Sequence, residues 1–138
     1  MAPVGVRLPV WEYGRKGGTI GRVSRRILIV DDHAGFRASA RRMLEAGGFE
    51  VAGEAADAAS ARVAFSVLSP DANLLDVQLP DGDGIALAGE LTANGAATVI
   101  LTSSRPPDQL GSDLTTSGAV GFIPKDELTP TTIMGLIP

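Results

Sequence analysis

The chain of 138 residues contains no cysteine. This absence excludes disulfide bonds, thiolate metal sites and thiol nucleophiles. No apolar run approaches the roughly 20 residues that cross a bilayer. Arg7 and Pro9 interrupt the region in which a signal peptide would carry its apolar stretch. We therefore expect a cytoplasmic protein that makes no contact with a membrane.

Basic residues are scarce outside the N-terminal segment. Residues 1–26 contain six basic residues and one acidic residue, whereas residues 27–138 contain six basic and fifteen acidic residues. We interpret residues 1–25, with their glycines and prolines and no periodicity, as a flexible basic segment, and residues 26–138 as one folded domain. The acidic domain disfavours direct binding of nucleic acid by this chain, and the basic segment resembles a solvated tail more than a binding arm.

Short apolar runs alternate with segments of helical periodicity along residues 26–138. The first run, residues 27–30, is continuous and ends in two aspartates, as expected of a strand buried on both faces of a parallel sheet. The pattern predicts further strands at residues 49–54, 72–77, 98–102 and 120–123. It predicts helices at residues 34–46, 58–68 and 84–92, a weak helix at 108–116, and a last helix beginning at Pro130. Such alternation predicts an α/β fold with a parallel sheet covered on both faces.

Polar residues follow several of these strands. Because ligands of such sheets bind beyond the carboxyl ends of the strands, we expect one cluster that contains Asp31, Asp32, Asp76, Thr102 and Lys125. Converging carboxylates favour a hard cation such as Mg²⁺, and a lysine and a hydroxyl beside them suit the oxygens of a phosphoryl group. The spacing does not identify the attacking aspartate. Taken singly, each residue also fits a structural role, such as a helix cap or a surface charge.

Four motifs carry a resemblance to a known family. They are the stretches Ile-Leu-Ile-Val-Asp-Asp at 27–32, Leu-Leu-Asp-Val-Gln-Leu-Pro-Asp-Gly at 74–82, Val-Ile-Leu-Thr-Ser-Ser at 99–104 and Gly-Phe-Ile-Pro-Lys at 121–125. In this order they resemble the receiver domains of bacterial response regulators over about residues 26–129. Among these receiver domains, the sequence is most similar to the LuxR/NarL-type subgroup. The resemblance implies a flavodoxin-like, doubly wound sheet of five parallel strands in the order 2-1-3-4-5, with a short or irregular last helix here.

The resemblance also implies a role for each motif residue. Asp76 would accept a phosphoryl group from a histidine kinase or a small phosphodonor, so that the chain is a phosphoacceptor and not an enzyme, apart from slow autodephosphorylation. Asp32, Asp76 and the backbone carbonyl of Gln78 would ligate Mg²⁺, and Asp31 would act through water. Lys125 would pair with the phosphoryl oxygens.

Further implied roles concern the response to phosphorylation. Thr102 would hydrogen-bond to the phosphoryl group, and Phe122 would turn inward with it as an aromatic switch. Gln78 and Ser104 would modulate hydrolysis of the acyl phosphate. Pro124 would match a cis peptide bond.

The chain departs from the family in two places. Asn73 stands in the middle of the third strand, where an apolar residue is usual, and residues 130–138 are short, β-branched and interrupted by Gly135. The second departure puts output or homodimerisation through the last helix in doubt. The length of this chain leaves no room for a DNA-binding domain beside the receiver. We therefore expect either a single-domain regulator that controls a downstream protein or a part of a longer regulator whose output domain lies outside this chain.

Two rival functions stay open at this stage. A degenerate receiver would keep the fold as a scaffold without being phosphorylated. Asn73 and the irregular terminus leave it open, whereas the intact set of Asp31, Asp32, Asp76, Thr102 and Lys125 argues against it. A phosphatase of the haloacid-dehalogenase type would need an acid two residues after its nucleophile. The chain has Gln78 there, and glutamine does not donate a proton in that way.

Overall fold

A computed structural model of the chain describes residues 25–93, 95, 97–110 and 114–138. Apart from Arg25, the predicted N-terminal segment therefore lies outside the described residues. None of the helices in this part of the chain has the length and apolar character that crossing a bilayer requires.

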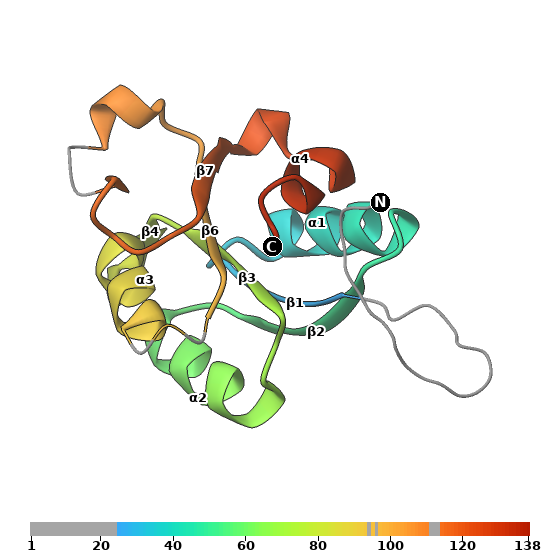
Figure 1. Cartoon of the computed structure of the whole chain (residues 1–138), viewed down its shortest axis with the longest axis horizontal. Helices are drawn as coiled ribbons and strands as arrows, with labels where there is room; N and C mark the ends of the chain where they lie inside the picture. Colours follow the sequence, from blue (N-terminus) through green and yellow to red (C-terminus); the bar gives the residue numbers. More distant parts are fainter. Residues whose placement is uncertain (1–24, 94, 96, 111–113) are drawn as a thin grey trace.

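The centre of the molecule is a sheet of five parallel strands in the order β2-β1-β3-β6-β7 (Figure 1). The strands are β1 (Arg26–Val30), β2 (Glu50–Ala55), β3 (Ala72–Asp76), β6 (Val99–Ser103) and β7 (Gly121–Pro124). Between β3 and β6, the two-residue strands β4 (Gln78–Leu79) and β5 (Gly82–Asp83) form a separate antiparallel hairpin. The predicted order 2-1-3-4-5 is thus confirmed, with β6 and β7 as the fourth and fifth strands of the main sheet.

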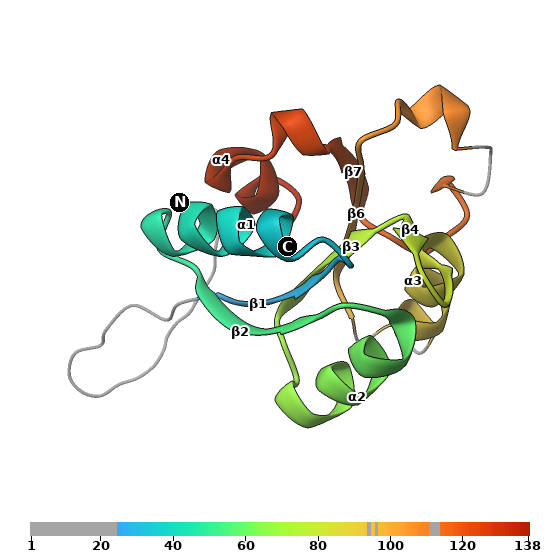
Figure 2. The same ribbon diagram turned by 180° about the vertical axis from the view of Figure 1, so that it is seen from behind.

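Helices cover both faces of this sheet (Figures 1 and 2). The helices α1 (Ala34–Ala46) and α4 (Pro130–Met134) lie on one face, and α2 (Ala58–Leu68) and α3 (Gly84–Thr92) lie on the other. Strand β3 is buried at every position and β1 at every position after Arg26, because helices pack on both faces of the sheet. In β1, Ile27 and Ile29 pack toward α1, whereas Leu28 and Val30 pack toward α2 and α3. This two-sided burial explains the continuous apolar runs and confirms the flavodoxin-like fold.

The prediction of a weak helix at residues 108–116 is wrong for the part of this segment that the structure describes. A single 3₁₀ turn, η1 (Pro107–Gln109), occupies its start, and Leu114 to Thr116 form another short turn. The segment contains a glycine and two threonines, which are poor helix formers, and two prolines precede it. Its apolar positions were too few to offset this composition.

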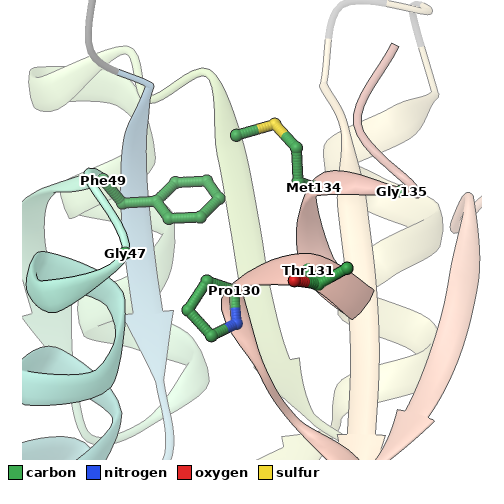
Figure 3. A pocket seen from close by; sticks show the side chains of 6 residues that line it. All are labelled: Gly47, Phe49, Pro130, Thr131, Met134 and Gly135. Atoms are coloured by element: carbon green, nitrogen blue, oxygen red, sulfur yellow. The ribbon is translucent and has the colours of Figure 1, made fainter.

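The last helix is as short as the sequence predicts. Thr129 caps α4 through a reciprocal pair of hydrogen bonds with Thr132, and Pro130 occupies the first turn, where its missing N–H costs nothing. Gly47, which ends α1, lies so close to Pro130 that a Cβ on the glycine would overlap the proline ring. Beside this contact an open groove of about 450 Å³ is lined by Gly47, Phe49, Pro130, Thr131, Met134 and Gly135 (Figure 3). It contains none of the predicted site residues.

Asn73 is fully buried in β3, as its position predicts. Its side-chain Nδ2 donates to the carbonyl oxygen of Thr98 at 3.1 Å. Its Oδ1 has no hydrogen-bond partner within the described structure. Only half of the amide is therefore satisfied, and the unpaired oxygen costs stability.

Candidate functional site

The predicted polar residues meet at the carboxyl edge of the sheet. Asp31 directly follows β1, Asp76 ends β3, Thr102 lies near the end of β6, and Lys125 follows β7. Parallel strands in register bring these ends together: Asp76 pairs with Thr102, and Thr102 pairs with Ile123. The topology therefore assembles a cluster from residues that are far apart in the sequence.

The ammonium group of Lys125 lies between two carboxylates. Its Nζ is 2.7 Å from Oδ2 of Asp31 and 3.3 Å from Oδ2 of Asp76. The Lys125 side chain is only 18% exposed, and that of Asp31 is not exposed at all. An ion pair this far from solvent is strong in isolation, but it also removes both groups from water.

The two aspartates respond differently to this environment. Burial acts to raise the pKa of Asp31, but Lys125 and the backbone N–H of His33 hold it below its ordinary value. Burial and the nearby charge of Asp31 raise the pKa of Asp76, although the N–H of Gln78 and Lys125 oppose the rise. The attraction of both carboxylates outweighs burial at Lys125 and raises its pKa. The site thus favours the charged form of Lys125 and disfavours the charged form of Asp76, chiefly because Asp76 is buried.

A metal ion has suitable ligands here. Asp31, Asp32, His33 and Asp76 each present one ligand atom, and these atoms lie within 4.8 Å of one another. The carboxylate of Asp32 is partly exposed, and Nδ1 of His33 lies 3.1 Å from it. Three carboxylates with one lysine leave a net negative site, whose oxygen donors fit Mg²⁺.

The site opens to solvent through a cavity of about 280 Å³. Its lining residues include Asp32, His33, Asp76, Gln78, Ser104 and Lys125. The backbone N–H of Gln78 donates to Oδ1 of Asp76 at 3.1 Å. The predicted modulating residues Gln78 and Ser104 therefore line the same cavity as Asp76.

Thr102 and Phe122 are not among the residues that line this cavity. The buried hydroxyl of Thr102 donates to the carbonyl oxygen of Ile123 at 2.6 Å, so it links β6 to β7 and does not point to a carboxylate. Phe122 is partly buried and packs against the core on the α2 and α3 face. The two residues lie on the neighbouring strands β6 and β7, one position out of register, because Thr102 pairs with Ile123 and Phe122 pairs with Leu101.

The cis peptide bond expected at Pro124 is absent. The described residues contain no cis peptide bond, and Pro124 extends β7 in register with Ser103. The trans bond continues the extended strand up to Lys125.

A close backbone contact fixes the strand that carries Asp76. A Cβ on Gly84 would overlap the backbone carbonyl oxygen of Asp76, and the N–H of Gly84 donates to the carbonyl oxygen of Val77 at 2.7 Å. Only glycine leaves room for α3 to begin against the end of β3. The site therefore depends on a residue without a side chain.

The family model of the response regulator receiver domain matches residues 27–137. The chain belongs to this family. Its fold is that of a receiver domain of two-component signalling. The resemblance seen in the sequence is thereby confirmed.

Relatives extend the comparison. The transcriptional regulatory protein PdtaR of Mycobacterium tuberculosis is 32% identical over 116 residues, which cover 84% of this chain and 55% of that protein. The chain spans about half the length of the first curated relatives that it matches. The receiver domain of NarL from the same organism shares 32% identity and a TM-score of 0.72 over 81% of this chain and 91% of that one. The Borrelia burgdorferi CheX–CheY complex with BeF₃ and Mg²⁺ shares 27% identity, with a TM-score of 0.71, over 82% and 86% of the two chains.

Sequence reasoning missed four residues at this receiver site. Arg37, His33 and Phe36 belong to the start of α1 and contact Asp31 or Lys125, and Gly84 abuts Asp76. For Gly84, the signal was a glycine that follows directly on Asp83 at the start of a predicted helix, where glycine is otherwise unfavourable. For Phe36, the helical spacing indicated only a core position.

Proposed function

We propose that this receiver domain is phosphorylated on Asp76 and changes conformation as a result. The observation that carries the proposal is the position of Asp76: of the two carboxylates that border the open cavity, Asp32 and Asp76, it is the one beside Lys125, at 3.3 Å. Asp31 is more deeply buried and engages the same lysine more closely, at 2.7 Å. Asp76 is therefore free to act as the nucleophile while Asp31 holds the lysine.

The transfer uses groups that this chain supplies. A carboxylate oxygen of Asp76 forms a bond to phosphorus, and the bond from phosphorus to the nitrogen of a kinase phosphohistidine, or to the oxygen of acetyl phosphate, breaks. The electron pair leaves with the histidine or the acetate. Lys125 accompanies the phosphoryl oxygens and limits the build-up of negative charge.

A divalent cation fits the same site. Asp31, Asp32 and Asp76, with the backbone carbonyl of Gln78, would hold Mg²⁺, which supplies charge neutralisation for the transferring phosphoryl group. The fit rests on the converging oxygen donors and on the net negative charge left by one lysine among three aspartates. The similar CheY of Borrelia burgdorferi was solved in a complex with BeF₃ and Mg²⁺, which supports a divalent cation at this site.

Thr102 and Phe122 would transmit the change. To reach a phosphoryl oxygen, the Thr102 hydroxyl has to leave the carbonyl oxygen of Ile123, its present acceptor at 2.6 Å. The hydroxyl would gain a hydrogen bond to a charged phosphoryl oxygen, whereas the carbonyl oxygen of Ile123 would lose its side-chain donor. Ile123 follows Phe122 directly, and the released carbonyl loosens the same stretch of β7. Phe122 offers no hydroxyl to a partner, so it would report the switch by packing alone.

The partners follow from this role. A histidine kinase would supply the phosphoryl group, and a downstream protein, an output domain outside this chain or a second copy of the domain would bind the switched surface. The acidic domain is not expected to bind nucleic acid by itself. The chain would act as a phosphoacceptor and not as an enzyme, and a cytoplasmic location suits that role.

Intact-mass measurement after incubation with acetyl phosphate and Mg²⁺ tests the proposal. We expect a gain of one phosphoryl mass in the wild-type chain and in Asp108→Asn, which changes an exposed aspartate on η1. We expect no gain in Asp76→Asn or when EDTA removes the metal. If the wild-type chain shows no adduct and does not bind beryllofluoride, the degenerate scaffold function replaces the proposal.

A further inference from the structure

An aromatic ring borders the ammonium group of Lys125. Phe36, in the first turn of α1, places its ring face 4.3 Å from Nζ of Lys125, measured to the ring centroid. The ring is partly buried and packs against the core cluster on the α1 face. Lys125 thus has the carboxylates of Asp31 and Asp76 at one side and an aromatic face at another.

The start of α1 is fixed to the end of β1. The guanidinium of Arg37 donates to the carbonyl oxygen of Asp31 at 2.7 Å and also to Glu54 at 3.0 Å. The backbone N–H of His33 donates to Oδ1 of Asp31 at 2.8 Å. These bonds tie the turn that carries Phe36 to the residue whose side chain binds Lys125. The ring of Phe36 and the carboxylate of Asp31 are therefore held in fixed positions relative to each other.

A lysine side chain has to be held in place by its neighbours, because it carries a compact charge on a flexible stem of four methylene groups. Two carboxylates attract the ammonium, but they leave it free to swing toward solvent through the open cavity. An aromatic face carries negative quadrupole density and attracts a cation within about 6 Å. An aliphatic side chain of similar volume would fill the space without this attraction.

We infer that Phe36 is a positioning residue for Lys125. Its ring holds the ammonium beside Asp76, where it meets the incoming phosphoryl oxygens; in this respect the inference rests on the proposed phosphorylation. Phe36 does not touch the reacting atoms and acts only through the lysine. It therefore affects how often the ammonium is in place and leaves the metal ligands unchanged.

Two variants separate attraction by the ring from simple packing. Phe36→Leu keeps most of the apolar volume and removes the aromatic face, whereas Phe36→Tyr keeps the face. We expect Phe36→Leu to lower the rate constant of phosphorylation by acetyl phosphate about 3- to 10-fold. We expect Phe36→Tyr to restore it. The affinity for Mg²⁺, measured by isothermal titration calorimetry, is expected to remain at the wild-type value in both variants.

A second readout follows Lys125 itself. In NMR spectra, the ε-methylene protons of Lys125 are expected to be shifted upfield by the ring, and Phe36→Leu is expected to abolish that shift while Phe36→Tyr preserves it. Equal rates in wild-type and Phe36→Leu overturn the inference, and so does an equal loss in both variants, which would indicate packing. A fall in Mg²⁺ affinity in Phe36→Leu also overturns it.

The two proposals fail in different ways. If the wild-type chain is not phosphorylated, the proposed function fails, and the methylene shift alone still decides whether the ring holds the lysine. If the wild-type chain is phosphorylated and the shift is missing, only the inference about Phe36 fails.

Discussion

Lys125 lies closer to Asp31, at 2.7 Å, than to any other carboxylate of the described structure, and the Asp31 side chain is completely buried. A buried carboxylate without a cation is costly, because neither water nor hydrogen-bond donors fully replace its hydration. The lysine therefore has a structural task at Asp31 in addition to the chemical task that we propose for it at Asp76.

Replacing Lys125 with methionine should expose this double task. Lys125→Met leaves Asp31 and Asp76 without their shared cation, and we expect the free energy of unfolding to fall by about 3 kcal/mol without Mg²⁺. Urea denaturation at neutral pH measures this. The double variant Lys125→Met/Asp31→Asn should recover a large part of the loss, because the buried charge is removed as well. Equal stability of the single and double variants would show that the pair is not coupled.

Gly84 should tolerate no side chain. In Gly84→Ala the new Cβ meets the carbonyl oxygen of Asp76, and because that atom is backbone, relief requires α3 or β3 to shift. We expect a loss of about 2–3 kcal/mol in the free energy of unfolding, with a lower rate of phosphorylation of Asp76. Gly35→Ala is the matched control, since nothing lies within 4 Å of a Cβ there, and α-helical alanine should instead add about 0.5–1 kcal/mol. A Gly84→Ala variant as stable as wild type would disprove the close contact.

Asn73 should be replaceable by leucine with a gain in stability. The change removes the unpaired buried Oδ1, and Thr98 keeps the backbone N–H of residue 73 as a donor to its carbonyl oxygen, at 2.9 Å. We expect Asn73→Leu to raise the free energy of unfolding by about 1 kcal/mol. Thermal or urea unfolding measures it, and Asn73→Asp, which buries a charge, should be strongly destabilised. A loss of stability in Asn73→Leu would mean that the amide makes a contribution that the hydrogen bonds do not reveal.

The ion pairs of Glu54 should make stability depend on pH. Arg41 and Arg37, at 2.7 and 3.0 Å, hold the pKa of Glu54 below its ordinary value, against the effect of burial. A depressed folded-state pKa contributes stability above the unfolded pKa, near 4.5, and this contribution is lost as the pH falls through the folded value. The difference in unfolding free energy between wild type and Glu54→Gln should therefore be about 1 kcal/mol at neutral pH and shrink below about pH 4.5.

The control for this experiment is Glu127→Gln, since Glu127 is exposed and makes no ion pair within the described residues. Its difference from wild type should stay near zero throughout the titration. A wild-type advantage over Glu54→Gln that is unchanged in acid would contradict the role of the two arginines.

Much of the fold and the membership of the site could be predicted from the sequence. The run at residues 27–30 is apolar at every position because β1 is covered on both faces, and this burial leaves a pattern that local composition reveals. Once the strands are parallel, the residues that follow them must reach the same edge. Asp31, Asp76, Thr102 and Lys125 therefore belong together before any contact is seen, although the turn at residues 107–109 and the trans bond before Pro124 were not foreseen.

The sequence by itself determined the alternation of strands and helices, the strand order through the family motifs, and the identity of the polar residues at the carboxyl edge. Only the tertiary structure decided that the ammonium group of Lys125 contacts Asp31 and the ring of Phe36. The same holds for the hydrogen bond from Thr102 to the carbonyl oxygen of Ile123 and for the contact of Gly84 with Asp76. The physical reason is distance along the chain. Periodicity and propensity act over a few residues, whereas these contacts join segments that meet only when the helices pack onto the sheet.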